Sequence, residues 1–505
     1  MKYLMGIDSG GTVTKAGIYD VRGNEIAVAR NTFDIILPGD GMNERDIQQF
    51  KNANLSAIKQ AVKLSGIDPR DIAGVAVAGQ GNGMYMFDAD GRPTYNGILS
   101  GDMRARNYIK KWNADGTLDR ILPKTKQILW AGQTTALIAW FADHNREVLD
   151  KTKTIVTCKD YIRYLLTGKF CMEMTEASGL SAMNLDTGKM DPEIFEALGI
   201  RDYMDKFPSE IRKPTDICGH VTRAAAAQTG LCEGTPVMGG MFDISACAAA
   251  SGVVDENIMC IIIGTWGINE YISREPVASR DMFMSTHYCM DGYYLMDEGS
   301  ATSASNLDWF VSRFMTEGRT QSEAYEEVNR LALSVPYNDS SLLFFPFLYG
   351  SNVNMDAKAG FLGLTARHTR AHMLRAIFEG IVFCHMYHIE KLYKFRNAFD
   401  VARISGGGTK SSLWVQMFAD CLGLPVEVSA AKELGVMGAA MCAGVGAGEY
   451  ADMREAARVF VRIARRFEPA EERRPYYLKK YSAYKKFLDA LDGVWKELAD
   501  IGGRD

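Results

Sequence analysis

Two segments far apart in the sequence share one pattern, a buried apolar run, a glycine-containing turn and a second run of strand character. The first covers Tyr3–Asp20 and the second, roughly 250 residues later, covers Asn257–Tyr271. In both segments the residues after the turn follow the period of two that is typical of a strand. The pair favours an internal duplication, with one phosphate-holding hairpin in each half of the chain. The alternative is two ordinary hairpins that happen to share a common turn.

The first turn, from Asp8 to Thr12, opens a strand, whereas a dinucleotide-binding fingerprint needs its glycines to open a helix. A G-x-x-x-x-G-K-[ST] loop is also absent, so both of these common nucleotide motifs are excluded. Successive backbone N–H groups in a glycine-rich turn bind anions, and Asp8 suits Mg²⁺ held through water. The predicted phosphate-binding residues are Gly10, Gly11, Thr12, Thr14 and Lys15. The alternative is a plain hairpin turn with a structural aspartate.

A single carboxylate, Asp243, lies between the diglycine Gly239-Gly240 and a small, apolar, helix-compatible segment that ends at Ser251. Glycine lets the backbone turn sharply and approach a ligand, and the following helix start favours anions. An aspartate in this position can accept the proton of a hydroxyl group that attacks a phosphoryl group. We therefore predict that Asp243 is a general base. The alternative is an aspartate that only caps the helix.

Polar side chains also follow two other strand-like segments. Gln80 and Asn82 come after the strand predicted at Ile72–Ala78, and Asp102 and Arg104 come after a second apolar run. Asp102 can accept from hydroxyl groups and the others can donate, which suits a polyol. The alternative for this second pair is a surface loop held by a salt bridge.

A third glycine cluster, Gly406-Gly407-Gly408, follows the strand-like Val401–Ser405 and precedes a helix predicted at Leu413–Leu422. Three glycines lose much chain entropy without any packing gain, and they leave room for a flat purine against the backbone. We predict that Gly407, Gly408 and Ser411 contact a nucleotide. The alternative is a flexible loop.

The chain of 505 residues is 47% hydrophobic and 24% charged, with a net charge of −5. This length predicts two large lobes or several smaller units, and no basic patch points to nucleic acid or membranes. The ten cysteines are scattered without a C-x-x-C pair, which favours a reducing compartment. The N-terminus lacks the apolar region of a signal peptide, so we expect a cytoplasmic protein.

Together these motifs resemble those of the FGGY carbohydrate kinases, in the same order and over essentially the whole chain. The two hairpin turns look like that family's phosphate motifs, Gly406-Gly407-Gly408 its adenosine motif, and Gly239–Asp243 the segment with the catalytic aspartate. Gly360–Leu364 and Arg375–Gly380 are similar to the family's C-terminal signature. The resemblance implies an α/β fold of two ribonuclease-H-like lobes of the actin and hexokinase type, with the active-site cleft between them. We place the lobes at residues 1–251 and 252–505, the second with a helical C-terminal tail.

The resemblance also implies a reaction and its ligands. ATP and Mg²⁺ would be the cofactors, with phosphate held near Gly264 and Thr265 as well as the first turn, and Phe242 and Asp243 would join the sugar-binding residues. The expected partners are a small sugar and ATP, with a homodimer as the candidate assembly and no nucleic acid or membrane. An actin-like ATPase that acts without a sugar, and an inactive sugar-binding regulator, are the alternatives from other classes.

Within the family, the likeness is greatest to L-xylulose and 3-keto-L-gulonate kinases. The segments that carry it are Asn43–Asp46, Gln80–Gly83, Ile98–Asp102, Gly264–Trp266 and Phe345–Asn352. D-xylulose kinases usually have a histidine where this chain has Gly81, and glycerol kinases have an Arg-Glu pair near that position. The alternatives within the family are D-xylulose, L-ribulose, erythritol and glycerol as substrates.

Overall fold

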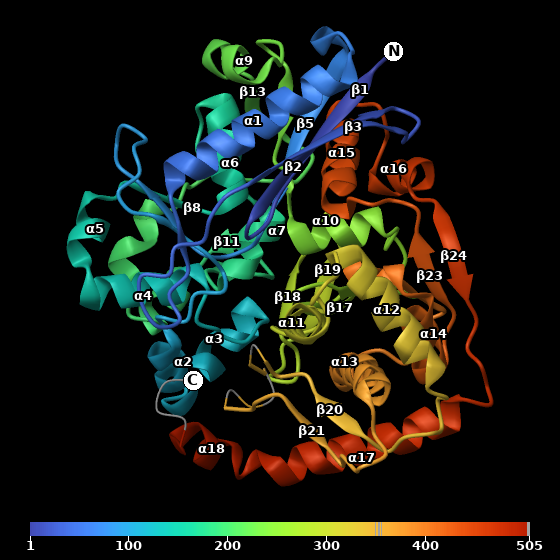
Figure 1. The fold of residues 1–505 in the computed structure, drawn as a ribbon. Coiled ribbons are helices and arrows are strands. Elements are labelled where there is room, and N and C mark those ends of the chain that lie inside the picture. Colours follow the sequence, from blue (N-terminus) through green and yellow to red (C-terminus); the bar gives the residue numbers. More distant parts are fainter. Residues whose placement is uncertain (349, 352–353, 355, 502–505) are drawn as a thin grey trace. The chain divides into compact units, whose positions relative to one another are not determined.

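The computed structural model describes residues 1–348, 350–351, 354 and 356–501 (Figure 1). Tyr349 and Asn352, which belong to one of the motifs above, lie outside the described residues. The chain forms two compact units. The first comprises Met1–Val254, Ile272–Met296 and Ala431–Val461, and the second comprises Asp255–Tyr271, Asp297–Ala430 and the residues from Arg462 onward. Each unit contains its own β-sheet, so the predicted α/β class is confirmed.

The first unit is built on a sheet with the strand order β13-β14-β5-β1-β2-β3, and β15 also pairs with β5. Strands β1 and β2 form the predicted hairpin, antiparallel with Gly6 opposite Gly17, while β1, β14 and β15 run parallel to β5. The strands are β1 (Tyr3–Ser9), β2 (Val13–Asp20), β3 (Glu25–Thr32), β5 (Ile72–Gly79), β13 (Ile217–His220), β14 (Pro236–Met238) and β15 (Met241–Phe242).

Helix α1 (Ile47–Ser65) covers one face of this sheet. It begins because the Asp46 side chain accepts from the Gln49 amide, and it ends at Gly66, which has a left-handed φ of 64°. Its apolar side, which includes Phe50 and Ile58, packs against Ile7 and Ile18 of the hairpin. The apolar residues of the segment Asp46–Leu64 have the spacing of a helix, and α1 agrees with that segment within one residue at each end.

Helix α15 (Leu434–Gly446) packs against β1, β2 and β5. It contacts the face that carries Gly6 and Gly17, and because successive strand side chains point to opposite faces, this is the face away from α1. Small residues let the backbones approach closely. A Cβ at Gly6 would lie 1.9 Å from the Val436 carbonyl oxygen, and one at Gly438 would lie 2.2 Å from the Ala246 carbonyl oxygen.

This packing places residues 431–461 in the first unit, although they follow most of the second unit in the sequence. The predicted division at residue 251 treats each lobe as one continuous segment, and it stays a prediction. The compact units differ from it, since the chain leaves the first unit near Val254 and returns to it twice.

The other elements of the first unit surround this sheet. The short strands are β4 (Glu44–Arg45), β6 (Tyr85–Phe87), β7 (Gly97–Ile98), β8 (Thr154–Val156), β9 (Met172–Glu173), β10 (Met183–Asn184), β11 (Lys189–Met190), β12 (Ile211–Arg212) and β18 (Met284–His287). The helices are α2 (Arg106–Ala114), α3 (Thr117–Thr125), α4 (Thr134–His144), α5 (Arg146–Lys151), α6 (Cys158–Thr167), α7 (Met174–Ala177), α8 (Pro192–Ala197), α9 (Arg223–Thr229), α10 (Asp243–Ala250) and α16 (Met453–Phe460), with the 3-10 turns η1 (Pro69–Asp71), η2 (Ser178–Leu180) and η3 (Arg201–Lys206).

The strands of the second unit follow the order β19-β17-β16-β22-β23-β24. Strands β16 and β17 form the second predicted hairpin, and β22 runs parallel to β16. The elements are β16 (Ile258–Ile263), β17 (Gly267–Ser273), β19 (Tyr294–Ser300), β20 (Leu343–Phe345), β21 (Gly360–Leu362), β22 (Val401–Ser405), β23 (Val426–Ser429), β24 (Ile463–Phe467), α11 (Ser305–Phe314), α12 (Gln321–Ser334), α13 (Arg370–Leu392), η4 (Gly407–Lys410), α14 (Ser412–Leu422), α17 (Arg474–Asp492) and α18 (Trp495–Ile501).

Three helices of this unit follow the sequence pattern closely. The segment after the third glycine cluster forms α14, one residue longer than predicted, because the Ser411 side chain accepts from the Trp414 amide and caps it. The long, mostly buried α13 lies beside α12, α14 and β20 (Figure 1). The predicted C-terminal helix is present as α17 and α18, which are separate helices.

Among the described residues, no helix combines the length and the apolar character needed to cross a membrane.

We predict that Gly438→Ala destabilises the protein. A Cβ at this position would meet the backbone of α10, which cannot move aside as a flexible side chain can. Overpacking of this kind typically costs about 1–3 kcal/mol, more than the ~1 kcal/mol that alanine adds to helix propensity. Thermal unfolding should show a lower Tm than wild type. The matched control is Gly493→Ala, where no atom lies within 4 Å, and an unchanged Tm for Gly438→Ala would contradict the prediction.

Candidate functional site

The carboxyl ends of three neighbouring parallel strands meet at one edge of the first sheet. Ser9 of β1 and Phe242 of β15 both pair with Gly79, the last residue of β5. Side chains that follow or end these strands therefore lie close together, and ligands of open α/β sheets bind at this kind of edge. The arrangement brings together Asp8, Gln80 and Asp243.

Asp243 is the first residue of α10, as predicted, and its Oδ1 accepts from the Ile244 amide at 2.8 Å. Burial, and then the nearby charge of Asp8, raises the pKa of Asp243 to about 8. Burial also raises the pKa of Asp8 to about 6, while Lys15 lowers it and Glu433 raises it. Two carboxyl groups with raised pKa values in one shielded place are typical of a site that exchanges protons or binds cations.

The turn of the first hairpin is held by backbone contacts. The Gly10 amide donates to the Val13 carbonyl at 3.0 Å, and the Thr12 carbonyl accepts from the Phe33 amide at 3.0 Å. Gly11 has space around it, since a Cβ there would meet only Gln80 Oε1, at 3.9 Å. The turn is therefore open at Gly11, which is compatible with the predicted binding of an anion by Gly10, Gly11 and Thr12.

Two predicted phosphate-binding residues are engaged elsewhere in the first unit. The buried Thr14 hydroxyl donates to Asn54 Oδ1 of α1 at 2.6 Å. The Lys15 ammonium group lies 2.6 Å from Glu433, which also pairs with Arg30 at 2.5 Å. Thr14 therefore ties the hairpin to α1, and Lys15 already pairs with a carboxylate that it shares with Arg30. Their predicted roles in binding a nucleotide stay predictions.

Gln80 is oriented by a buried arginine that the sequence analysis did not select for a role. Arg45 Nη2 donates to Gln80 Oε1 at 2.9 Å and to the Gly11 carbonyl at 3.0 Å. The buried Gln80 Nε2 has no hydrogen-bond partner in the part of the chain that the structure describes. Its donor is thus left for a ligand. The signal that could have identified Arg45 is its place in the Asn43–Asp46 motif.

Asn82 has a left-handed backbone, with φ of 59°, and its amide donates to Glu176 Oε1 at 2.7 Å. Both polar atoms of its buried side chain lack a partner among the described residues. Gly81 must be a glycine, since a Cβ there would lie 2.1 Å from the Phe242 ring. The Gly79–Gly83 segment therefore carries polar groups next to the aromatic ring of Phe242, a combination that is typical of a small-molecule site.

Asp102 and Arg104 form a buried ion network with Glu44. Arg104 donates to Asp102 Oδ1 through Nε at 2.8 Å and to Glu44 through Nη2 at 2.7 Å, and Asp102 Oδ2 accepts from the Asn43 amide at 2.8 Å. Both Asp102 oxygens are thus used by the protein. Within this pair, only Arg104 Nη1 has no partner in the described chain. Arg104 therefore has a donor left for a ligand, whereas Asp102 has no acceptor left.

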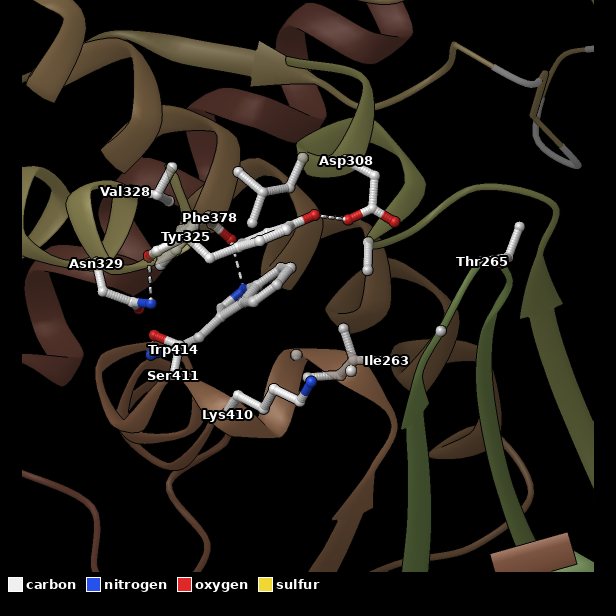
Figure 2. Close-up of a pocket in the computed structure, with 15 residues that line it drawn as sticks. Ile263, Thr265, Asp308, Tyr325, Val328, Asn329, Phe378, Lys410, Ser411 and Trp414 are labelled. Atoms are coloured by element: carbon white, nitrogen blue, oxygen red, sulfur yellow. Dashed lines mark hydrogen bonds between the residues drawn. The ribbon is translucent and has the colours of Figure 1, made fainter. Parts of the chain in front are cut away.

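The second unit contains a cavity of about 390 Å³ where the remaining predicted residues meet (Figure 2). The turn of the second hairpin contributes Gly264 and Thr265, and the third glycine cluster contributes Gly407 and Gly408, with Ser411 beside them. These two motifs are more than a hundred residues apart in the sequence, and the parallel pairing of β16 with β22 brings them together. The other lining residues are Ile263, Ala304, Leu307, Asp308, Tyr325, Val328, Asn329, Phe378, Lys410 and Trp414.

Several residues of this cavity were not selected from the sequence. Trp414 stacks on Phe378 at 4.7 Å between ring centroids, and its Nε1 donates to the Phe378 carbonyl at 3.2 Å. The Tyr325 hydroxyl donates to Asp308, and Asn329 Nδ2 donates to the Tyr325 carbonyl at 2.9 Å (Figure 2). Asn329 Oδ1 is buried without a partner among the described residues. Phe378 lies in the Arg375–Gly380 motif, whereas no local motif marks Tyr325, Asn329 or Trp414, which come from helices that only the fold brings to this cavity.

We predict that Asp243→Asn stabilises the protein while it removes the carboxylate. The pKa of Asp243 in the folded protein, about 8, is raised from an ordinary value of 3.8. Between these two pH values the unfolded chain ionises Asp243 and the folded protein does not, so the free energy of unfolding of the wild type falls as the pH rises from 3.8 towards 8. Asparagine is neutral throughout and can still accept from the Ile244 amide. The Tm of the variant should therefore exceed that of wild type, by a margin that grows between pH 4 and pH 8.

Asp191→Asn is the control of opposite sign. Partial burial raises the pKa of Asp191, but hydrogen bonds from Lys124, the Glu193 amide and Asn184 outweigh it and lower that pKa. Its removal should decrease Tm near neutral pH. A Tm for Asp243→Asn at or below that of wild type at pH 8 would show that the buried carboxylate costs no stability.

Comparison with known proteins identifies the family. Residues 3–250 match the N-terminal domain of the FGGY family of carbohydrate kinases, and residues 259–447 match its C-terminal domain. The chain is 35% identical to the L-xylulose/3-keto-L-gulonate kinase of Escherichia coli strain K12, over 97% of this chain and 98% of that protein. It is 34% identical to a probable L-xylulose kinase of Pasteurella multocida, over 98% of this chain and 100% of that protein.

Solved structures agree on the fold. A ligand-bound xylulose kinase from Lactobacillus acidophilus superposes with a TM-score of 0.91 at 22% identity, covering 99% of this chain and 100% of that one. A glycerol kinase from Plasmodium falciparum superposes with a TM-score of 0.85 at 21% identity, covering 97% and 98%. The chain therefore belongs to the FGGY family of carbohydrate kinases and is an ATP-dependent carbohydrate kinase.

Proposed function

We propose that the enzyme transfers the γ-phosphoryl group of ATP to a hydroxyl group of L-xylulose or 3-keto-L-gulonate, with Asp243 as the general base. The observation that carries the proposal is the convergence of Asp8, Asp243 and the unpartnered amides of Gln80 and Asn82 at one strand edge. The choice of sugar is supported by the relatives at 34–35% identity, whose names give L-xylulose or 3-keto-L-gulonate.

The chemistry follows from these groups. Asp243 accepts the proton of the substrate hydroxyl as its oxygen bonds to the γ-phosphorus, and the bond from that phosphorus to the bridging oxygen breaks, so that ADP leaves. Backbone N–H groups at Gly11 and Thr12, and at Thr265, would stabilise the charge on the phosphoryl oxygens, whereas the Gly10 and Gly264 amides donate within their own turns. Arg45 supports the first of these turns by donating to its carbonyls.

The residues present also fit Mg²⁺. Among the described residues no three His, Cys, Asp or Glu side chains gather into a ready-made metal site. Mg²⁺, however, is usually held by one or two carboxylates, with waters and substrate phosphates as the other ligands. Asp8 and Asp243 supply this pair, and the charge of Asp8 raises the pKa of Asp243, a cost that a bound cation would offset. When bound, the cation would neutralise charge on the phosphates, with Asp8 as its principal protein ligand.

The cavity of the second unit would take the adenosine part of ATP. Gly407 and Gly408 let a purine lie against the backbone of η4, with Trp414 and Tyr325 as aromatic neighbours. The unpartnered Asn329 Oδ1 would accept from the exocyclic amine of adenine. We place the enzyme in the cytoplasm, which agrees with ten cysteines that form no disulfide in the described chain, and we retain a homodimer as the proposed assembly.

Other sugars of the family test the substrate assignment. Purified enzyme with Mg-ATP should release ADP with L-xylulose or 3-keto-L-gulonate in preference to D-xylulose, L-ribulose, erythritol and glycerol. Preference for one of the last four would overturn the substrate and keep the kinase reaction. Asp243→Asn should lower kcat by about 10²–10⁴ while the sugar still binds in calorimetry, and near-normal turnover by this variant would remove Asp243 as the base.

A side chain at Gly407 should block the nucleotide site. A Cβ there has no atom within 4 Å, and the position lines the cavity. We expect Gly407→Val to raise the KM for ATP roughly tenfold or more, with Tm and the KM for sugar close to wild type. The control is Gly360→Val, which also has open space and lies outside the lining. Equal KM values for ATP in wild type and Gly407→Val would place the adenosine elsewhere.

A further inference from the structure

Two buried glutamates stand three residues apart at the ends of β9 and α7, and they differ in how their oxygens are used. Glu173 accepts from the Thr175 amide and hydroxyl, each at 2.7 Å, and lies 3.3 Å from Lys159. Glu176 accepts from the Asn82 amide through Oε1, and its Oε2 has no hydrogen-bond partner in the described chain. Glu173 is therefore fully satisfied by the fold, and Glu176 is half satisfied.

An unpaired oxygen on a fully buried carboxyl group is costly, because it has lost its water without gaining a donor. Native proteins leave few such groups, and those that remain commonly serve a ligand. A second residue carries the same cost. The amide of Asn82 donates to Glu176, and the buried side chain of Asn82 has no hydrogen-bond partner among the described residues.

Gly179 lies beside both Asn82 and Phe242. A Cβ at Gly179 would lie 3.5 Å from the Phe242 ring and 3.7 Å from Asn82 Nδ2. Phe242 immediately precedes Asp243, and its amide donates to the hydroxyl oxygen of Thr175, the residue before Glu176, at 2.9 Å. Glu176 and Asn82 thus lie close in the structure to Phe242, the residue next to the proposed base.

The unpartnered groups match a polyol. Glu176 Oε2 lacks a partner, and the Asn82 side chain offers an acceptor and N–H donors. Adjacent hydroxyl groups of a sugar, each able to donate and accept, would satisfy all of them at once. A carboxylate on the substrate has no proton to give, so it cannot donate to Glu176 Oε2.

We propose that Glu176, together with Asn82, binds hydroxyl groups of the substrate and makes the enzyme select an uncharged ketose over a sugar acid. The inference rests on the proposed function and narrows it, since it favours L-xylulose over 3-keto-L-gulonate. Glu176 is then a substrate-binding residue that determines specificity.

The test compares Glu176→Gln with wild type on L-xylulose and on analogues that each lack one hydroxyl group. Glutamine keeps the acceptor for the Asn82 amide and replaces Oε2 with a donor. Loss of a hydrogen bond in a buried site should raise the sugar KM and lower kcat/KM roughly 10- to 100-fold, with the KM for ATP unchanged. For one analogue the two enzymes should agree within about twofold, because that analogue lacks the hydroxyl group that Glu176 binds.

Glu173→Gln is the matched control, because its oxygens are all used within the protein. Any loss it causes should be the same for every analogue. If Glu176→Gln behaves in that way, or shows no loss on the parent sugar, the proposal is overturned. Should Glu176→Gln fail to fold, Asn82→Asp gives the same test, because aspartate also tolerates the left-handed backbone at this position.

Wild-type enzyme separates this inference from the proposed function. We expect kcat/KM at least about tenfold higher for L-xylulose than for 3-keto-L-gulonate, and a smaller ratio for Glu176→Gln. A wild-type preference for the acid would overturn the selectivity and leave the kinase reaction intact. If another sugar of the panel proves to be the substrate, the analogue series is built on that sugar and decides the role of Glu176 in the same way.

Discussion

The close approach of α15 to the first sheet is the contact on which the rest of the site depends. Glycines remove the side chains that would separate the backbones, so that a Cβ at Gly435 would lie 2.5 Å from Asp8 Oδ2 and one at Gly438 would touch α10. The helix thereby closes the shell around Asp8 and supports the helix that begins with Asp243. The raised pKa values of both carboxyl groups follow from this packing, since burial is their largest cause.

The packing also shows why some of the structure was predictable from the sequence and some was not. The hairpins, α1 and α14 depend on local signals, namely strand periodicity, the Asp46 and Ser411 caps and the glycine turns. Asp243 at the start of α10 was predicted for the same reason. The return of residues 431–461 to the first unit was not, because a helix of small apolar residues carries no mark of the surface that it covers.

The functional residues divide in the same way. Gly264 and Gly407 each stand in a recognisable turn, and the structure brings them into one cavity. Tyr325 and Asn329 face that cavity from α12, and only the tertiary fold could reveal them. Thr14 and Asp102 have suitable chemistry, but the fold has occupied their polar atoms in contacts with α1 and Arg104. A sequence shows which groups are present, whereas the availability of each group depends on its neighbours.

The buried Arg45 joins two parts of the site that are described separately above. Its planar guanidinium group donates through one nitrogen to the carbonyls of Gly10 and Gly11 and to the side chain of Gln80. Because that group is rigid, the phosphate turn and the beginning of the Gly79–Gly83 segment cannot shift independently of each other. A ligand that orders the phosphate turn also restricts the Gly79–Gly83 segment. The first substrate to bind therefore pays part of the conformational entropy that the second would otherwise lose.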